Sequence, residues 1–214
     1  MAVTKETVDS IVEFHGHMCP GLAMGIRAAE VALDELGAHS SDEEVVAIIE
    51  NNLCGVDAVQ FMTGCTFGRG NLVCLDHGKN AYTFVRRSDG RAVRVSSRAG
   101  GWGKDEDWDR RFARVRAGTA TPDEAAGFPA MVQDWSRRIL SGPIDDLYDV
   151  REVQVEAPQP ARIHVSVDCA ACGEATMETR IRRLDGRQLC IPCFERALAG
   201  TSPVAAPTQR RPEA

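Results

Sequence analysis

The 214-residue sequence has no long apolar run and no excess of basic residues, and only 6% of its residues are aromatic. No stretch approaches the roughly 18 consecutive apolar residues of a membrane helix, and residues 1–6 lack the apolar run of a secretory signal. With 25 Lys and Arg against 31 Asp and Glu, the chain has no overall positive field to attract nucleic acid. We therefore expect a globular cytoplasmic protein that does not associate with membranes.

Cysteine is the informative residue type, since a reducing compartment favours metal ligands or redox groups over structural disulfides. Two C-x2-C pairs separated by 17 residues have the spacing of a four-cysteine zinc site: Cys169, Cys172, Cys190 and Cys193. The alternatives are a redox C-x-x-C pair, a rubredoxin-like iron site or unrelated buried thiols. Four thiolates leave zinc no open position, so we expect a structural zinc in a small zinc-ribbon or treble-clef-like finger.

The sequence between and after these cysteines predicts a small hairpin that turns at Asp185 and Gly186, followed by a helix over 194–198. Five arginines give this segment a basic character: Arg180, Arg182, Arg183, Arg187 and Arg196. The finger could contact a partner protein. Nucleic acid is the less favoured partner, because no aromatic stacking surface accompanies the charge.

The rest of the chain predicts an α+β domain with an antiparallel or mixed sheet and packed helices. Apolar spacing indicates helices over 20–36, 55–62 and 128–139, and the first also carries small residues that would let another backbone approach closely. Strands are expected over 45–49, 72–75, 81–86, 91–97 and 150–155, with short connections that make the second, third and fourth antiparallel neighbours. The predicted domains are a core over 1–157, a finger over 158–198 and a disordered tail over 199–214.

Two imidazoles and a thiol immediately precede the first predicted helix, at His15, His17 and Cys19. Pro20 suits the first helical turn, so Cys19 is expected at or near the N-cap. There the helix dipole and the imidazoles would lower the pKa of the thiol, which favours a thiolate ligand or nucleophile. The alternative is a pair of hydrogen-bonded histidines beside a core thiol.

A second group of residues follows the first predicted strand. Cys54 comes at the end of that strand, Asp57 and Gln60 lie on the next helix, and Cys65 lies in the glycine-rich loop 64–70. Because strand ends and helix starts often share a crevice, Cys54 and Cys65 could face the His17 and Cys19 group. Cys74, inside an apolar strand, is expected to be a core residue.

Four motifs resemble those of the FmdE family, named for the FmdE component of tungsten/molybdenum formylmethanofuran dehydrogenase: FHGHMCPG at 14–21, CGVDAVQ at 54–60, TGCTFGRGNL at 63–72 and DHGKNAY at 76–82. The resemblance covers roughly residues 8–195. It implies an α+β core with a metal-holding cavity, a C-terminal zinc finger and, in some members, an intertwined homodimer. By motif, the cavity positions are His17, Cys19, Cys54 and Cys65, with His15, Asp57, Gln60, Thr66 and Lys79 as neighbours.

Two hypotheses of function follow. In the first, a core zinc, iron or nickel ion or a reactive thiol serves an enzyme or an accessory subunit linked to molybdenum or tungsten oxidoreductases. Asp57 would act as base toward metal-bound water, or Cys19 would attack directly, with His17 accepting its proton and Lys79 stabilising developing charge. In the second, the protein is a non-enzymatic metal sensor, regulator or assembly partner that uses the finger for protein or nucleic-acid contact.

Overall fold

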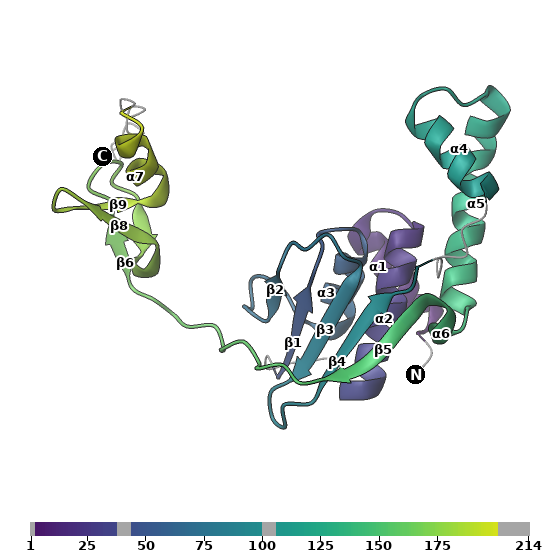
Figure 1. The fold of residues 1–214 in the computed structure, drawn as a ribbon, viewed down its shortest axis with the longest axis horizontal. Helices are drawn as coiled ribbons and strands as arrows, with labels where there is room; N and C mark the ends of the chain where they lie inside the picture. The colour runs from purple at the N-terminus through teal and green to yellow at the C-terminus, as the bar shows by residue number, and fades with distance from the viewer. Residues whose placement is uncertain (1–2, 38–43, 100–105, 201–214) are drawn as a thin grey trace, which may run out of the picture. The chain divides into compact units, whose positions relative to one another are not determined.

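The computed structural model describes residues 3–37, 44–99 and 106–200, which fall into two compact units, Met1–Ala161 and Arg162–Ala214 (Figure 1). The predicted tail, 199–214, lies from residue 201 onward outside the described residues. In the described part of the chain, no helix is both long and apolar enough to cross a membrane.

The N-terminal unit contains a five-stranded mixed sheet of order β2-β1-β3-β4-β5. Its strands are β1 (Val45–Ile49), β2 (Leu72–Cys74), β3 (Ala81–Arg86), β4 (Ala92–Ser97) and β5 (Tyr148–Val153). β1 runs parallel to β2 and antiparallel to β3, and the pairs β3–β4 and β4–β5 are antiparallel. This arrangement, together with the packed helices, confirms the predicted α+β class with a mixed sheet.

The expected antiparallel pairing of β2 with β3 is wrong, because β1 lies between these two strands. The short loop after β2 closes around the end of β1 instead of forming a hairpin. At its start the Leu75 N–H donates to the Ile49 carbonyl, and near its end the Lys79 N–H donates to the Glu50 carbonyl. Positive φ angles at Asp76 (46°) and Gly78 (68°) let the loop turn twice within a few residues.

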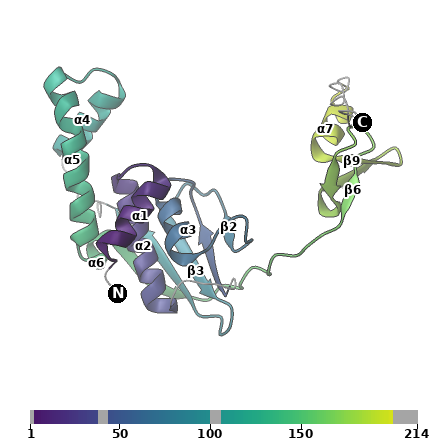
Figure 2. The same ribbon diagram turned by 180° about the vertical axis from the view of Figure 1, so that it is seen from behind.

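Three helices cover one face of the sheet: α1 (Lys5–His15), α2 (Pro20–Leu36) and α3 (Gly55–Thr63) (Figures 1 and 2). α2 is the predicted central helix, and its buried residues include Leu22, Met24 and Ile26. Small residues let α2 and α3 approach closely, as predicted. A Cβ atom placed on Gly25 of α2 would lie only 2.2 Å from the carbonyl oxygen of Gly55 at the start of α3.

The remaining helices of this unit are α4 (Glu106–Arg116), α5 (Pro122–Ser141) and the short α6 (Ile144–Leu147). The predicted apolar stripe of α5 packs on α4 through an edge-to-face contact of Trp108 and Trp135, whose ring centroids are 3.9 Å apart. Within the core, the Tyr148 hydroxyl donates to the Met24 carbonyl at 2.7 Å and so ties β5 to α2.

The C-terminal unit consists of two small hairpins and a helix. Its elements are β6 (Ser166–Asp168), β7 (Ala175–Met177), a 3-10 turn (Glu178–Arg180), β8 (Ile181–Leu184), β9 (Arg187–Cys190) and α7 (Ile191–Leu198). Asp185 and Gly186 both have positive φ angles, 49° and 77°, as a tight two-residue hairpin turn requires. The predicted hairpin and helix of the finger are therefore confirmed.

Candidate metal centres

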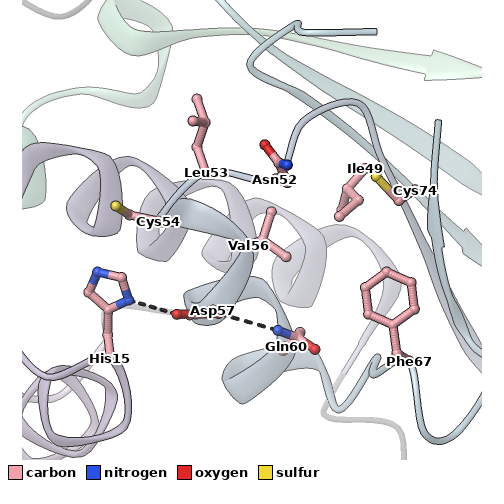
Figure 3. Close-up of a pocket in the computed structure, with 10 residues that line it drawn as sticks. All are labelled: His15, Ile49, Asn52, Leu53, Cys54, Val56, Asp57, Gln60, Phe67 and Cys74. Atoms are coloured by element: carbon pink, nitrogen blue, oxygen red, sulfur yellow. Dashed lines mark hydrogen bonds and ion pairs between the residues drawn. The ribbon is translucent and has the colours of Figure 1, made fainter. Parts of the chain in front are cut away.

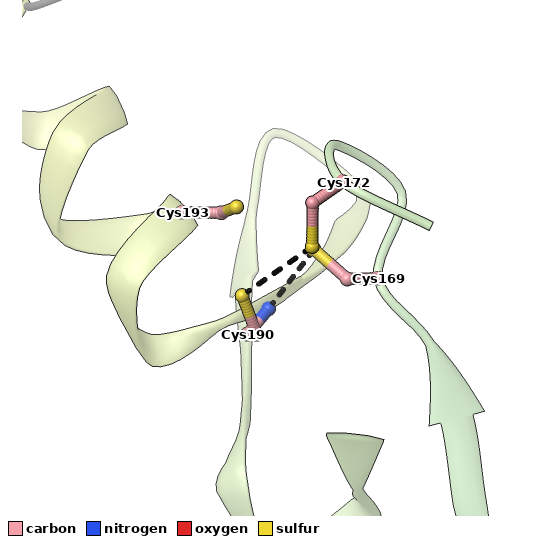
Figure 4. A group of neighbouring side chains, drawn as sticks. All are labelled: Cys169, Cys172, Cys190 and Cys193. Carbon is pink, nitrogen blue, oxygen red and sulfur yellow. Dashed lines mark hydrogen bonds between the residues drawn. The ribbon is translucent and has the colours of Figure 1, made fainter. Parts of the chain in front are cut away.

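The four cysteines of the C-terminal unit converge on one point (Figure 4). All four sulfurs lie within 4.8 Å of one another, and the Cys172 and Cys190 sulfurs are 3.9 Å apart. Tetrahedral zinc with Zn–S bonds of about 2.3 Å separates its ligand sulfurs by roughly 3.8 Å. Burial raises the pKa of the Cys169 thiol. Hydrogen bonds from backbone N–H groups, of which that of Cys190 has the largest effect, outweigh burial and lower this pKa to about 6. The quartet fits a structural zinc with no open position.

A second group of donors forms where α1 gives way to α2. α1 ends at Gly16, whose φ of 99° reverses the chain, and α2 begins at Pro20 with Cys19 as its N-cap, as predicted. This tight connection brings together one ligand atom each of His15, His17 and Cys19, all within 4.8 Å of one another. The two imidazole rings lie 4.9 Å apart between centroids.

His15 is held in a specific orientation by α3 (Figure 3). Its Nδ1 atom is 2.7 Å from Oδ2 of Asp57, and Gln60 donates to the other Asp57 oxygen at 3.4 Å. A carboxylate acceptor fixes the proton on Nδ1 and leaves Nε2 as an acceptor. The Nε2 atom is buried and has no hydrogen-bond partner. The family motifs place His15 only beside the cavity, whereas the structure makes it one of the three clustered donors.

Cys19 differs electrostatically from the prediction. Its sulfur accepts a hydrogen bond from the Leu22 N–H at 3.3 Å, as an N-cap does. Burial nevertheless raises the pKa of the Cys19 thiol to about 11; the neighbouring Cys54 thiol adds to the rise, and the Leu22 and Gly21 N–H groups oppose it. The predicted lowering of this pKa is wrong because desolvation outweighs the helix terminus. Without a metal ion, Cys19 is a neutral thiol near pH 7.

Cys54 lies next to Cys19 at the N-cap of α3. A Cβ atom placed on Gly21 would lie 3.8 Å from the Cys54 sulfur and 3.9 Å from the Cys19 sulfur, so both thiols lie beside this glycine. Cys54 is not one of the three donors that all lie within 4.8 Å of one another. It is a neighbour of the cluster.

The structure does not bring Cys65 or Lys79 to this cluster. Cys65 follows the opposite end of α3, about 13 Å along the helix from Cys54, and its buried thiol donates to the Val45 carbonyl at 3.3 Å. Lys79 is exposed and is not one of the residues that line the adjoining pocket. Its backbone is used in contacts with Glu50 and Asn51.

A pocket of about 390 Å³ opens at His15, the one of the three donors that lines it (Figure 3). His15 and Cys54 form one side of its lining, and Cys74 lies on the opposite side. The prediction that Cys74 is a core residue is wrong, because Cys74 ends β2 and is exposed. Leu53 and Phe67 also line the pocket and remain 59% and 65% exposed, so apolar side chains stand beside the polar Asn52 and Gln60 in its lining.

Comparison with known proteins gives two family matches. The model described as "FmdE, Molybdenum formylmethanofuran dehydrogenase operon" matches residues 14–149, and the prokaryotic dksA/traR C4-type zinc finger matches residues 164–197. The second match agrees with the cysteine quartet.

Individual relatives extend these matches. The chain is 36% identical over 191 residues to a "probable S-adenosyl-L-methionine-binding protein" of Archaeoglobus fulgidus; the match covers 85% of this chain and spans only 50% of the relative's length. It also resembles the crystal structure of a tungsten formylmethanofuran dehydrogenase FmdE-like protein from Syntrophus aciditrophicus, with a TM-score of 0.61 and 24% identity over 89% of this chain and 91% of that chain. At 24% identity, the resemblance to the Syntrophus structure is evidence for a shared fold and not for a shared function.

Proposed function

The chain belongs to the FmdE family, and on that premise we propose that its N-terminal unit binds a transition-metal ion through His15, His17 and Cys19. In this proposal the bound ion faces the adjoining pocket, while the C-terminal finger holds a structural zinc ion. The two units would have different tasks, because the core metal would keep a coordination position free of protein ligands and the finger metal would not. The finger would be structural, and the cluster would act on a ligand in the pocket.

The state of His15 carries this proposal. Leaving a buried polar nitrogen without a partner costs about 1–3 kcal/mol, and a metal ion at Nε2 would remove that cost. The Asp57 contact at Nδ1 is the outer carboxylate partner typical of metal-ligating histidines. Two imidazoles with one thiolate suit zinc, iron or nickel rather than magnesium or calcium.

Three protein ligands would leave a coordination position open to water or a ligand in the pocket. A bound ion would supply Lewis acidity there. Since Asp57 accepts a hydrogen bond from the His15 imidazole, we assign it a positioning role instead of the predicted role as base. The metal would hold Cys19 as a thiolate, so we favour Cys19 as a ligand over Cys19 as an unaided nucleophile. Lys79, outside the pocket lining, receives no role.

The pocket favours a metal-dependent enzyme or a ligand-binding accessory subunit over a sensor that works through the finger alone. S-adenosyl-L-methionine is a candidate ligand, since the Archaeoglobus relative is named for it. The exposed ring of Phe67 could stack on an adenine, and the partly exposed Asp57 carboxylate could face a sulfonium cation. Calorimetric titration with S-adenosyl-L-methionine, with and without metal, tests this candidate; absence of heat in both titrations would rule it out.

We also propose that a second copy of the chain covers the pocket mouth to form a homodimer in the cytoplasm. The exposed rings of Phe14 and Phe61 pair with their centroids 6.0 Å apart, and the exposed Leu53 and Phe67 line the pocket, so the unit carries several uncovered apolar side chains that a second copy would cover. Eight free cysteines are compatible with a reducing compartment. A monomer mass that does not change with concentration in light scattering would contradict the dimer.

Metal analysis of untagged protein tests the core centre. We expect two metal equivalents per chain in the wild type and one in the double variant His17→Ala/Cys19→Ala, because the finger keeps its own zinc. Cys74→Ser is the matched control, since it removes a thiol that lines the pocket outside the donor cluster, and it should retain both equivalents. One equivalent in all three proteins would refute the core centre.

The same double variant separates the two classes of function. Loss of turnover with intact partner binding would support the enzyme or accessory subunit. Loss of metal-dependent partner binding would support the sensor or assembly partner, which would use the exposed arginines of the finger hairpin.

A further inference from the structure

Two half-buried thiols meet where two helices begin. Cys19 is the N-cap of α2 and Cys54 is the N-cap of α3. The close approach of Gly25 to Gly55 holds these helices together near their first turns. Both sulfurs lie beside Gly21, each less than 4 Å from the point that its Cβ would occupy, and the Cys54 thiol is close enough to act directly on the Cys19 thiol.

We propose that Cys19 and Cys54 form a reversible disulfide on exposure to a peroxide, and that this bond releases the metal ion from the His15, His17 and Cys19 cluster. The metal-release part rests on the proposed function; the disulfide itself does not. The bond would take the thiolate ligand from the ion and leave two imidazoles, which are too few to hold it. The N-terminal unit would then switch between a metal-loaded reduced form and a metal-free oxidised form.

The positions of the two thiols give them different chemical tasks. Cys54 lines the pocket, so a small peroxide can reach its sulfur without opening the core. Its sulfur attacks one peroxide oxygen, the O–O bond breaks, and the products are a sulfenic acid and water. The Cys19 sulfur then attacks the Cys54 sulfur and displaces a second water. In total, the two sulfurs lose two electrons and one hydrogen peroxide becomes two waters. In the metal-free protein both protons come from the thiols, whereas in the metal-loaded protein Cys19 is a thiolate and solvent supplies the proton of the second water.

The other thiols of the N-terminal unit are poorly placed for this reaction. Cys65 is buried beyond the far end of α3 and is hydrogen-bonded to the Val45 carbonyl. Cys74 lies across the pocket from Cys54 (Figure 3). A disulfide forms only between cysteines that are close neighbours, and Cys19 and Cys54 are the pair whose sulfurs share one neighbouring residue, Gly21. Small thiols in excess would reduce the bond by exchange and restore the metal-binding form.

The test uses the full zinc-loaded chain and one equivalent of hydrogen peroxide. Trypsin leaves Cys19 in peptide 6–27 and both Cys54 and Cys65 in peptide 28–69, and a chymotryptic cut after Phe61 separates the latter two. Mass spectrometry should then find Cys19 linked to Cys54. Zinc release is measured in parallel with a chromophoric chelator, in the wild type, Cys54→Ser and the control Cys74→Ser.

We expect the wild type and Cys74→Ser to release more zinc than Cys54→Ser once the release from the finger, read from the oxidation of its four cysteines in the same digest, is subtracted. Equal release from all three, or a wild type that keeps its core metal and shows no Cys19–Cys54 link, would overturn the proposal. A wild type without core metal would instead refute the proposed function and the release step. Peptide mapping of that metal-free protein would still decide whether the disulfide forms.

Discussion

Replacing Gly25 by Ala should destabilise the N-terminal unit although alanine is the better helix former. The added Cβ would lie 2.2 Å from the Gly55 carbonyl oxygen and 2.4 Å from its Cα, where ordinary contacts are 3.4 Å or more. The obstacle is backbone, so α2 and α3 must separate by roughly 1 Å. Overpacking of this kind costs about 1–3 kcal/mol. A net loss of about 2 kcal/mol would lower the Tm by roughly 4–8 °C.

Gly127→Ala is the matched control, because Gly127 also lies inside a helix, α5, and a Cβ there would have no neighbour within 4 Å. It should stabilise the protein by about 0.5–1 kcal/mol through helix propensity alone. Tryptophan fluorescence during urea unfolding follows the N-terminal unit selectively, since residues 162–214 contain no tryptophan. A Gly25→Ala protein as stable as Gly127→Ala would refute the close helix approach, and with it the packing that brings Cys19 and Cys54 together.

Three further outcomes are expected. Asp57→Asn should weaken core metal binding about 10- to 100-fold by removing the partner that orients His15, and unchanged affinity in a chelator competition would contradict this role. Cys172→Ser should release one zinc and open the C-terminal unit to protease while the N-terminal unit stays resistant, because metal binding supplies the folding free energy of so small a unit; an unchanged digestion pattern would argue against it. The hydrogen bond and charge of Arg94 lower the pKa of Glu50 below 4.5, so Glu50 stabilises the fold above that pH and loses its contribution as the pH falls. Glu50→Gln should therefore be less stable near neutral pH and lose less stability on acidification, and parallel unfolding curves for the two proteins would exclude this effect.

Most elements of the fold could be predicted because their signals are local. The bounds of α2 follow from Pro20 at its start and Gly37 at its end, and β1 is a continuous β-branched run. The position of β2 beside β1 could not be predicted, since nothing in loop 75–80 shows that it closes around the end of another strand. Strand order depends on contacts between distant segments, which spacing along the chain does not encode.

The finger ligands could be predicted from spacing, and the core donors only in part. The predicted donor set omits His15 because helix α1, which positions it, is not among the predicted helices. Thr4 as N-cap and Gly16 as C-cap are nevertheless signals of this helix that the sequence contains. The predicted set includes Cys65 because strand ends and helix starts are expected to share a crevice and because the family motif implies a cavity position there. A nine-residue helix, α3, separates Cys65 from Cys54, and the length of this helix shows that the two cannot share one site. The raised pKa of Cys19 depends on burial, which local sequence does not give.

The parallel pairing of β1 with β2 places the pocket at the carboxyl ends of two parallel strands, where open α/β sheets bind their ligands. Of the strand pairs in the described part of the chain, β1 and β2 alone run parallel, with α3 as the crossover between them. Cys54 follows the carboxyl end of β1, and Cys74 is the last residue of β2, so the pocket opens at the edge where open α/β sheets take their ligands. Residues 50–54 and 75–80 leave the sheet at this edge. Asn52, Leu53 and Cys54 line the pocket, so exchange of the first of these loops would change the pocket lining while the strands beneath it stay unchanged.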